Sequence, residues 1–392
     1  MSASKKVVLA YSGGLDTSVC LAWLKERGFD VVTFCAELGQ GGDLVQAKAN
    51  ALKIGAIKAY SKDLQREFAQ DFVRPALQAG AIYEQKYLLA TALSRPLIAK
   101  HLAAIARKEG AAYVAHGCTG KGNDQVRFEV ALAALLPKVQ VLAPVREWEL
   151  ASREEEIVYA KERGIPVPVT KKNPYSLDEN LWGVSIECGA LEDPWNAPPE
   201  DAYQWTTSPL KAPRKPTVVT IDFVKGVPVK LNGRKMPLVQ LIARLNALGS
   251  KYGIGRADLL EDRLVGLKSR EIYEAPGATI LHAAHQDLEA LNLHREVLDF
   301  KELVARQYAR LVYDGLWYSP LRSALDGFVK ETQAIITGSV KIRLTPGQAV
   351  AVSRKSPKSL YQKKLATYSD QDEFDQSASK GFIQIWGLPY RT

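Results

Sequence analysis

The amino-acid sequence predicts an α/β protein in which a doubly wound parallel sheet is followed by a second, α+β domain and a C-terminal extension. Strand-like and helix-like segments alternate over the first 170 residues, as they do in a doubly wound sheet. Beyond that point the alternation stops and hairpin patterns follow. We therefore expect domains at residues 1–170, 171–355 and 356–392.

The first domain is predicted from short apolar runs separated by helical patterns. Strands are expected at residues 7–11, 31–36, 57–60, 113–116 and 139–143. Helices are expected at residues 43–54 and 95–109, because a glycine follows each amphipathic run. A capping box that begins at Ser152 predicts a further helix ending near residue 163.

The rest of the chain has a different texture. Residues 173–200 are rich in Pro, Asn, Asp and Trp without periodicity, which predicts a long functional loop or a domain connection. Hairpins are expected at residues 217–231 and 340–352, with a helix at 238–248 between them. A polar helical stretch is expected at residues 359–369. The apolar end at 381–388 should pack on another domain or subunit.

Composition narrows the class of protein. The net charge is +9, but the basic residues form short clusters rather than one dense tract, so we expect no nucleic-acid partner. No run approaches the ~20 apolar residues of a membrane helix. The four cysteines are isolated, which argues against a zinc ribbon or a disulfide framework and favours the cytoplasm. No metal bound by a protein cage is expected.

The loop after the first predicted strand is the strongest local signal. Its letters, AYSGGLDTS, lack the Lys of a Walker A loop and the spacing of G-x-G-x-x-G, but they match S-G-G-x-D-[ST]. That pattern is similar to the PP-loop of enzymes that split ATP into AMP and pyrophosphate. A glycine loop before a helix favours phosphate, since free amides and the helix dipole face the anion. Asp16 is expected to hold Mg²⁺ or a substrate cation. The structural alternative is a turn with Asp16 and Thr17 as helix caps.

A second glycine-rich loop follows the fourth predicted strand. Gly117, Gly120 and Gly122 precede an Asn123-Asp124 helix start, and such loops gather at the carboxyl ends of parallel strands. The alternative is a flexible turn with Asn123 as cap. His116 is equally well explained as a packed histidine or as a ligand. Residues 83–96 and 175–185 are polar clusters that fit either solvated loops or sites.

Taken in order, these segments resemble the argininosuccinate synthase family. The resemblance rests on AYSGGLDTS, YLLATALSRP, AHGCTGKGNDQVRFE, YSLDENLWGVS and EDRLVGLKSREIYEAPGATIL, and it covers nearly the whole chain. It implies an ATP-dependent ligase of the PP-loop superfamily that joins citrulline and aspartate into argininosuccinate and releases AMP and pyrophosphate. It also implies small-molecule substrates and a homotetramer.

The resemblance implies a set of site residues. ATP would be held by Ala10, Tyr11, Ser12, Gly13, Gly14, Leu15, Asp16, Thr17, Ser18, Ala36 and Gly117. Aspartate would be held by Thr119, Asn123 and Asp124. Citrulline would be held by Tyr87, Thr91, Asn123, Arg127, Ser176, Ser185, Glu261 and Tyr273. Two positions depart from the family: Ala92, where a serine is usual, and Glu271, where many members have glycine.

The chemistry predicts roles for three of these residues and for Arg95. Attack of the ureido oxygen on the α-phosphate needs charge stabilised on the phosphates, for which Asp16 with Mg²⁺ and Arg95 are candidates. Displacement of AMP needs a positioned amine, and Asp124 and Ser176 are expected to orient the two reactants.

Three other functions fit the sequence less well. An ammonia-using synthetase would need a glutaminase unit, which the sequence does not show. A tRNA-modifying enzyme would favour paired cysteines and a denser basic tract. A nucleotide sensor would not need two glycine loops and a large second domain.

Overall fold

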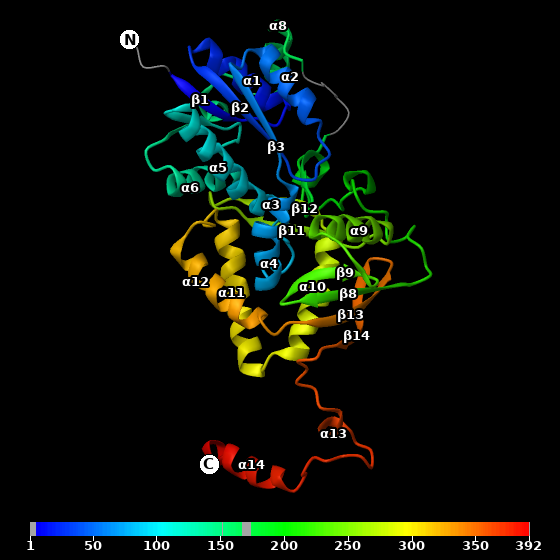
Figure 1. Ribbon diagram of the computed structural model, residues 1–392. Helices are drawn as coiled ribbons and strands as arrows, with labels where there is room; N and C mark the ends of the chain where they lie inside the picture. The colour runs from blue at the N-terminus through cyan, green and yellow to red at the C-terminus, as the bar shows by residue number, and fades with distance from the viewer. Residues whose placement is uncertain (1–4, 151, 167–173, 392) are drawn as a thin grey trace.

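The computed structural model describes residues 5–150, 152–166 and 174–391. Its first lobe is built on a parallel sheet with the order β3-β2-β1-β4-β5, so the doubly wound α/β prediction is confirmed (Figure 1). The strands are β1 (Lys6–Ala10), β2 (Asp30–Glu37), β3 (Lys58–Asp63), β4 (Tyr113–Ala115) and β5 (Gln140–Leu142). All five lie within three residues of their predicted bounds, most clearly the central strands β1 and β2, which are apolar runs with buried residues.

Helices cover both faces of this sheet. They are α1 (Leu15–Glu26), α2 (Leu44–Ile54), α5 (Ala90–Glu109), α6 (Asp124–Leu135), α7 (Pro144–Glu147) and α8 (Arg153–Glu162). The Asp43 side chain caps α2 and the Ser152 side chain caps α8, as the sequence predicts. Helix α5 begins five residues before its predicted start, since the Tyr87 hydroxyl accepts hydrogen bonds from the amides of Thr91 and Ala92.

The second lobe contains two antiparallel sheets. One has the order β11-β12-β7-β6, from β6 (Ser176–Asn180), β7 (Gly183–Glu187), β11 (Arg256–Asp262) and β12 (Lys268–Glu274). The other has the order β10-β9-β8-β13-β14, from β8 (Thr217–Val224), β9 (Val227–Leu231), β10 (Arg234–Lys235), β13 (Gly338–Thr345) and β14 (Gln348–Lys355). Both predicted hairpins are confirmed. The predicted boundary at residue 170 lies outside the described residues, and the boundary at 355 stays a prediction.

The expected loop at residues 173–200 is wrong where β6 and β7 form a hairpin. Trp182, Val184 and Ile186 are buried, and β7 pairs with β12 nearly ninety residues later in the chain. Only short 3-10 turns, at Gly189–Glu192 and Glu200–Ala202, follow the hairpin. The strands exist because of this distant pairing, which local periodicity does not reveal.

Helices complete the second lobe and the end of the chain. They are α9 (Leu238–Lys251), α10 (Pro276–Asn292), α11 (Arg295–Tyr313), α12 (Pro320–Gln333), α13 (Lys363–Ala366), α14 (Ala378–Trp386) and a 3-10 turn (Leu388–Tyr390). The helix expected at 359–369 is reduced to the four residues of α13. Helix α14 extends away from the body and none of its residues is buried (Figure 1).

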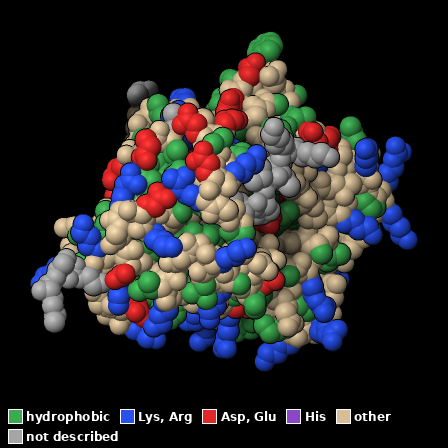
Figure 2. Space-filling view, turned by 90° about the horizontal axis from the view of Figure 1, so that it is seen from above, with side chains coloured by type: hydrophobic (Ala, Val, Ile, Leu, Met, Phe, Trp, Pro, Cys, Tyr) green, Lys and Arg blue, Asp and Glu red, His purple; other side chains and the backbone are tan. Residues whose placement is uncertain are grey.

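The surface at the first lobe carries both signs of charge. Figure 2 looks onto this end of the molecule, where lysine and arginine side chains are interspersed with aspartate and glutamate. No helix in the described part of the chain is long and apolar enough to cross a membrane.

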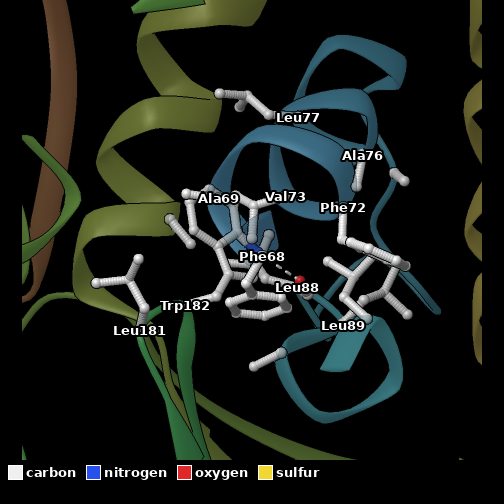
Figure 3. Close-up of a cluster of buried hydrophobic side chains, with 14 of the residues drawn as sticks. Phe68, Ala69, Phe72, Val73, Ala76, Leu77, Leu88, Leu89, Leu181 and Trp182 are labelled. Atoms are coloured by element: carbon white, nitrogen blue, oxygen red, sulfur yellow. Dashed lines mark hydrogen bonds between the residues drawn. The ribbon is translucent and has the colours of Figure 1, made fainter. Parts of the chain in front are cut away.

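One segment ties the two lobes together. Between β3 and α5 the chain leaves the parallel sheet through α3 (Gln65–Glu67), a π-helical turn (Phe68–Val73) and α4 (Arg74–Ala79). Helix α4 packs against α10, α11 and α12 of the second lobe. Figure 3 shows the buried cluster that results, in which the Trp182 indole donates to the Leu88 carbonyl at 2.8 Å. The apolar core is therefore continuous across both lobes.

Candidate functional site

The loop between β1 and α1 has the geometry of an anion site. Gly13 has φ of +83°, a left-handed conformation that glycine adopts without strain. The Ser12 and Thr17 hydroxyls lie 3.0 Å apart, and the amide of Gly14 donates to Ser12. Ser12 and Gly14 are exposed at the amino end of α1, where backbone amides favour a phosphate.

Two further polar side chains of this loop, those of Tyr11 and Ser18, point inward. Ser18 is fully buried, and its hydroxyl lies 3.2 Å from that of Tyr11, which is also buried. This pair supports the loop from beneath. Neither Asp16 nor Thr17 caps α1, because the N-cap is Gly14, and the Thr17 hydroxyl instead donates to the Gly14 carbonyl at 3.4 Å.

Asp16 has a carboxylate neighbour that the sequence did not indicate. Burial, together with the charge of Asp16, raises the pKa of Glu156 on α8 to about 8. Oε2 of Glu156 is buried without a hydrogen-bond partner among the described residues. Two adjacent carboxylates with no cation between them suit a hard divalent ion.

The second glycine-rich loop lies against the first. A Cβ atom placed on Gly117 would be 3.2 Å from Cγ2 of Thr17, so the two loops are in contact. The amide of Gln125 closes the loop by donating to the Gly120 carbonyl at 2.6 Å. His116 is buried and lies 3.2 Å from Glu129, so the structure favours a packed histidine here.

Asp124 joins this loop to two arginines. Its Oδ2 accepts from Arg95 at 2.7 Å and its Oδ1 from Arg127 at 3.0 Å. Burial acts to raise the pKa of Asp124, but the two guanidinium groups outweigh it and hold this pKa below its usual value. Arg95 also pairs with Asp178 of β6. The guanidinium of Arg127 lies 4.8 Å from the centre of the Tyr313 ring.

A buried acid and tyrosine cluster adjoins these arginines. Glu261 of β11 accepts from Tyr313 at 2.8 Å and from Tyr273 at 2.5 Å. The ring of Tyr87 stacks on Tyr273, with 4.1 Å between centroids. Asn123 reaches into the same cluster, since its amide donates to Tyr313 at 2.8 Å. Its side chain therefore does not cap α6, and the alternative of a plain helix cap is wrong.

The remaining predicted residues line the same region. Thr91 and Ser185 share a hydrogen bond of 2.9 Å, which brings the start of α5 onto β7. Ser176 is exposed at the start of β6, two residues before Asp178 and so on the same face of the strand as the residue that pairs with Arg95. Ala36 lies near the end of β2, two residues beyond the partner of Ala10 and opposite Lys62 of β3, and Thr119 lies in the second loop.

The departures from the family pattern have local explanations. Ala92 is fully buried, and its amide still bonds the Tyr87 hydroxyl. Glu271 pairs with Arg263 at 3.0 Å, and its Oε2 lies 2.8 Å from the Tyr273 hydroxyl. Arg263 was not predicted as a site residue, because its place in a family segment does not show which carboxylates it faces, and no motif marks Glu156 or Tyr313. Asp178 falls inside a polar cluster noted in the sequence.

Fold and site together define a nucleotide-binding α/β protein whose second lobe completes the site. A family model described as Arginosuccinate synthase N-terminal HUP domain matches residues 6–166. A second, described as Arginosuccinate synthase C-terminal domain, matches residues 175–392.

Curated relatives agree over nearly the whole length. Argininosuccinate synthase of Geobacillus thermodenitrificans is 58% identical over 99% of this chain and 95% of its own. Those of Halalkalibacterium halodurans and Limosilactobacillus reuteri are 57% and 55% identical, each over 99% of this chain and 94% of their own. A solved structure titled as a predicted subunit of tRNA methyltransferase from Methanocaldococcus jannaschii covers 40% of this chain and 76% of its own, at 15% identity and a TM-score of 0.29. That likeness is too low to bear on function.

The chain belongs to the argininosuccinate synthase family. This confirms the predicted reaction, in which an ATP-dependent ligase joins citrulline and aspartate in arginine biosynthesis.

Proposed function

We propose that ATP binds across the two glycine-rich loops, with citrulline against the acid and tyrosine cluster and aspartate at residues 119–124. The observation that carries this arrangement is the position of α6. Its first turn contacts the cluster through Asn123 and the two arginines through Asp124, while Gly117 of the preceding loop touches Thr17. Three substrates can therefore meet around one helix start.

The first step is attack of the ureido oxygen on the α-phosphate, with pyrophosphate leaving. The Gly13 amide and the hydroxyls of Ser12 and Thr17 would hold the phosphate oxygens, while the Ser12 and Gly14 amides support those hydroxyls. The Tyr11 and Ser18 pair keeps the loop in shape from below. Arg95 is held by two carboxylates and supplies a fixed positive charge near the second loop.

Asp16 and Glu156 fit Mg²⁺, because a divalent ion bound between the two carboxyl groups would replace the proton that the raised pKa of Glu156 keeps there. When bound, the ion would stabilise charge on the phosphates. An Asp16→Asn variant should stay folded and lose turnover of Mg-ATP. Full turnover would remove Asp16 from the mechanism.

The second step is addition of the aspartate amine to the activated carbon, with AMP leaving. Both oxygens of Asp124 are engaged by Arg95 and Arg127, so this carboxylate fixes the two guanidinium groups and faces the amine from between them. The citrulline side is held by Asn123, Glu261 and Tyr273 and by the Thr91–Ser185 pair. Positioning supplies most of the rate enhancement.

One assay tests the substrate assignment. Pyrophosphate release from ATP is measured with citrulline, aspartate or ammonia supplied in turn, and we expect it to require citrulline. Asp124→Ala should lose argininosuccinate formation far more than citrulline-dependent pyrophosphate release. Equal loss of both in a folded Asp124→Asn variant would contradict the separate role of Asp124.

We also propose that the chain forms a homotetramer in the cytoplasm. Helix α14 supports the assembly, because Phe382, Ile383, Ile385 and Trp386 are each more than 60% exposed on an arm that leaves the body. The four cysteines support the compartment, since all are free thiols in the structure. Mass measurement by light scattering tests the assembly, and a monomer at micromolar concentration would contradict it.

A further inference from the structure

The hydroxyl of Tyr273 lies between two carboxylates. It is 2.5 Å from Oε2 of Glu261 and 2.8 Å from Oε2 of Glu271. A phenol has one proton and can donate it to only one of them. If both carboxylates were ionised, the other contact would join two oxygens with no hydrogen between them. The three groups must therefore share a second proton.

The surrounding charges indicate which carboxylate holds that proton. Oε1 of Glu271 lies 3.0 Å from the guanidinium of Arg263, so Glu271 has a cation beside it. Glu261 forms no ion pair with any described lysine, arginine or histidine, and its other oxygen accepts from Tyr313. Burial, and then the charge of Glu271, raise the pKa of Glu261 to about 8.

The other elements packed on Glu261 also bring polar and charged side chains to it. These groups are Asn123 and Arg127 from α6, Tyr313 from α11, and Tyr83 and Tyr87 from the segment before α5. Arg127 is the one cation among them, and Asp124 already pairs with it. The negative charge that Glu261 faces most directly is that of Glu271, through the shared Tyr273 hydroxyl.

We propose that Glu271 is a positioning residue of the citrulline site. It keeps a proton on Glu261 while the site is empty, and this proton leaves to solvent when citrulline binds. This rests on the proposed placement of citrulline. The only cationic group of citrulline is its α-ammonium, and a carboxylate holds an ammonium strongly only when it is ionised. Glu261 then carries the negative charge, and the Tyr273 proton can turn to Glu271. No covalent bond to carbon changes.

The test is calorimetric titration with citrulline in the presence of α,β-methylene-ATP, which cannot be split between the α- and β-phosphates. Heats measured in two buffers of different ionisation enthalpy give the protons released. At pH 6.5 we expect about one proton per citrulline, and an apparent Kd that falls about tenfold per pH unit between pH 6 and 7.5. Glu271→Gln should release less than half as much and bind about tenfold more tightly at pH 6.5.

Glu187→Gln is the matched control. Glu187 also pairs with Arg263, at 2.5 Å, but it makes no hydrogen bond to Tyr273, so this variant should keep the wild-type proton release. Circular dichroism checks that each variant is folded, and Glu271→Gly replaces Glu271→Gln if the latter is not. Buffer-independent heats in the wild type, or one pH profile shared by wild type and variant, would overturn the proposal. Failure of citrulline to bind the wild type at any pH would contradict the proposed function instead.

Discussion

The contact between the two glycine-rich loops can be tested with a single methyl group. Gly117→Ala would place Cβ 3.2 Å from Cγ2 of Thr17 and 3.5 Å from Sγ of Cys20. Carbon atoms pack best at ~3.5–4.0 Å, so Thr17 must move by a few tenths of an ångström. The backbone at Gly117 has no positive φ, so the substitution adds crowding without conformational strain.

The expected effect is on ATP rather than on folding. Because Thr17 shares a hydrogen bond of 3.0 Å with Ser12, its displacement disturbs the phosphate loop directly. A misplacement of 1 Å can cost about a hundredfold in rate, so half that displacement predicts about a tenfold loss of kcat/KM for ATP. The free energy of unfolding should fall by no more than about 1 kcal/mol.

The assay is steady-state pyrophosphate release at saturating citrulline and aspartate, with thermal unfolding measured in parallel. Gly120→Ala is the matched control in the same loop. Its Cβ would meet only the Arg146 side chain, at an ordinary 3.8 Å, and its kinetics should match the wild type. The explanation by loop contact would be refuted if Gly117→Ala kept the wild-type kcat/KM for ATP. It would also be refuted if Gly117→Ala and Gly120→Ala lost kcat/KM equally.

Three further predictions concern stability and assembly. Trp182→Ala should lower the free energy of unfolding, measured by chemical denaturation, by about 3–5 kcal/mol, because a fully buried side chain and its hydrogen bond are lost. Trp195 is 93% exposed, so Trp195→Ala should lower it by less than about 0.5 kcal/mol. Glu156 has a folded-state pKa raised to about 8, so its carboxyl costs stability as the pH rises from its unfolded pKa toward 8. The free energy of unfolding of Glu156→Gln should therefore exceed that of the wild type by on the order of 1 kcal/mol at pH 8 and should equal it at pH 4. A gain that is equal at both pH values would contradict the pairing of Glu156 with Asp16. Truncation after Asp370 removes α14 and should lower the mass found by light scattering while ATP binding is kept; an unchanged mass would show that α14 is not part of the interface.

The parallel sheet was predictable because its signal is local. Its central strands β1 and β2 are apolar runs, and Asp43 and Ser152 mark helix starts by their own side chains. The start of α5 was missed because its cap is the phenol of Tyr87, a residue type that is not a usual cap. The hairpin of β6 and β7 was missed because β12 completes it from far along the chain.

The residues of the candidate site also include some that the sequence indicated and some that only the fold reveals. Family motifs led to Asn123, Asp124 and Arg127, and the structure brings these three together. Motifs did not indicate Glu156 or Arg263, since their importance comes from which carboxylates they face in space. Spatial proximity of charges has no signature in one sequence.

The segment between β3 and α5 has a consequence for how the protein is made. Phe72 stacks on Trp317 with 4.7 Å between centroids, although Trp317 is synthesised more than 200 residues later. At ~5–20 residues per second, Phe72 waits roughly 10 to 50 s on the ribosome before Trp317 is made. The nascent amino-terminal half therefore exposes the part of this segment's apolar surface that the second lobe later covers.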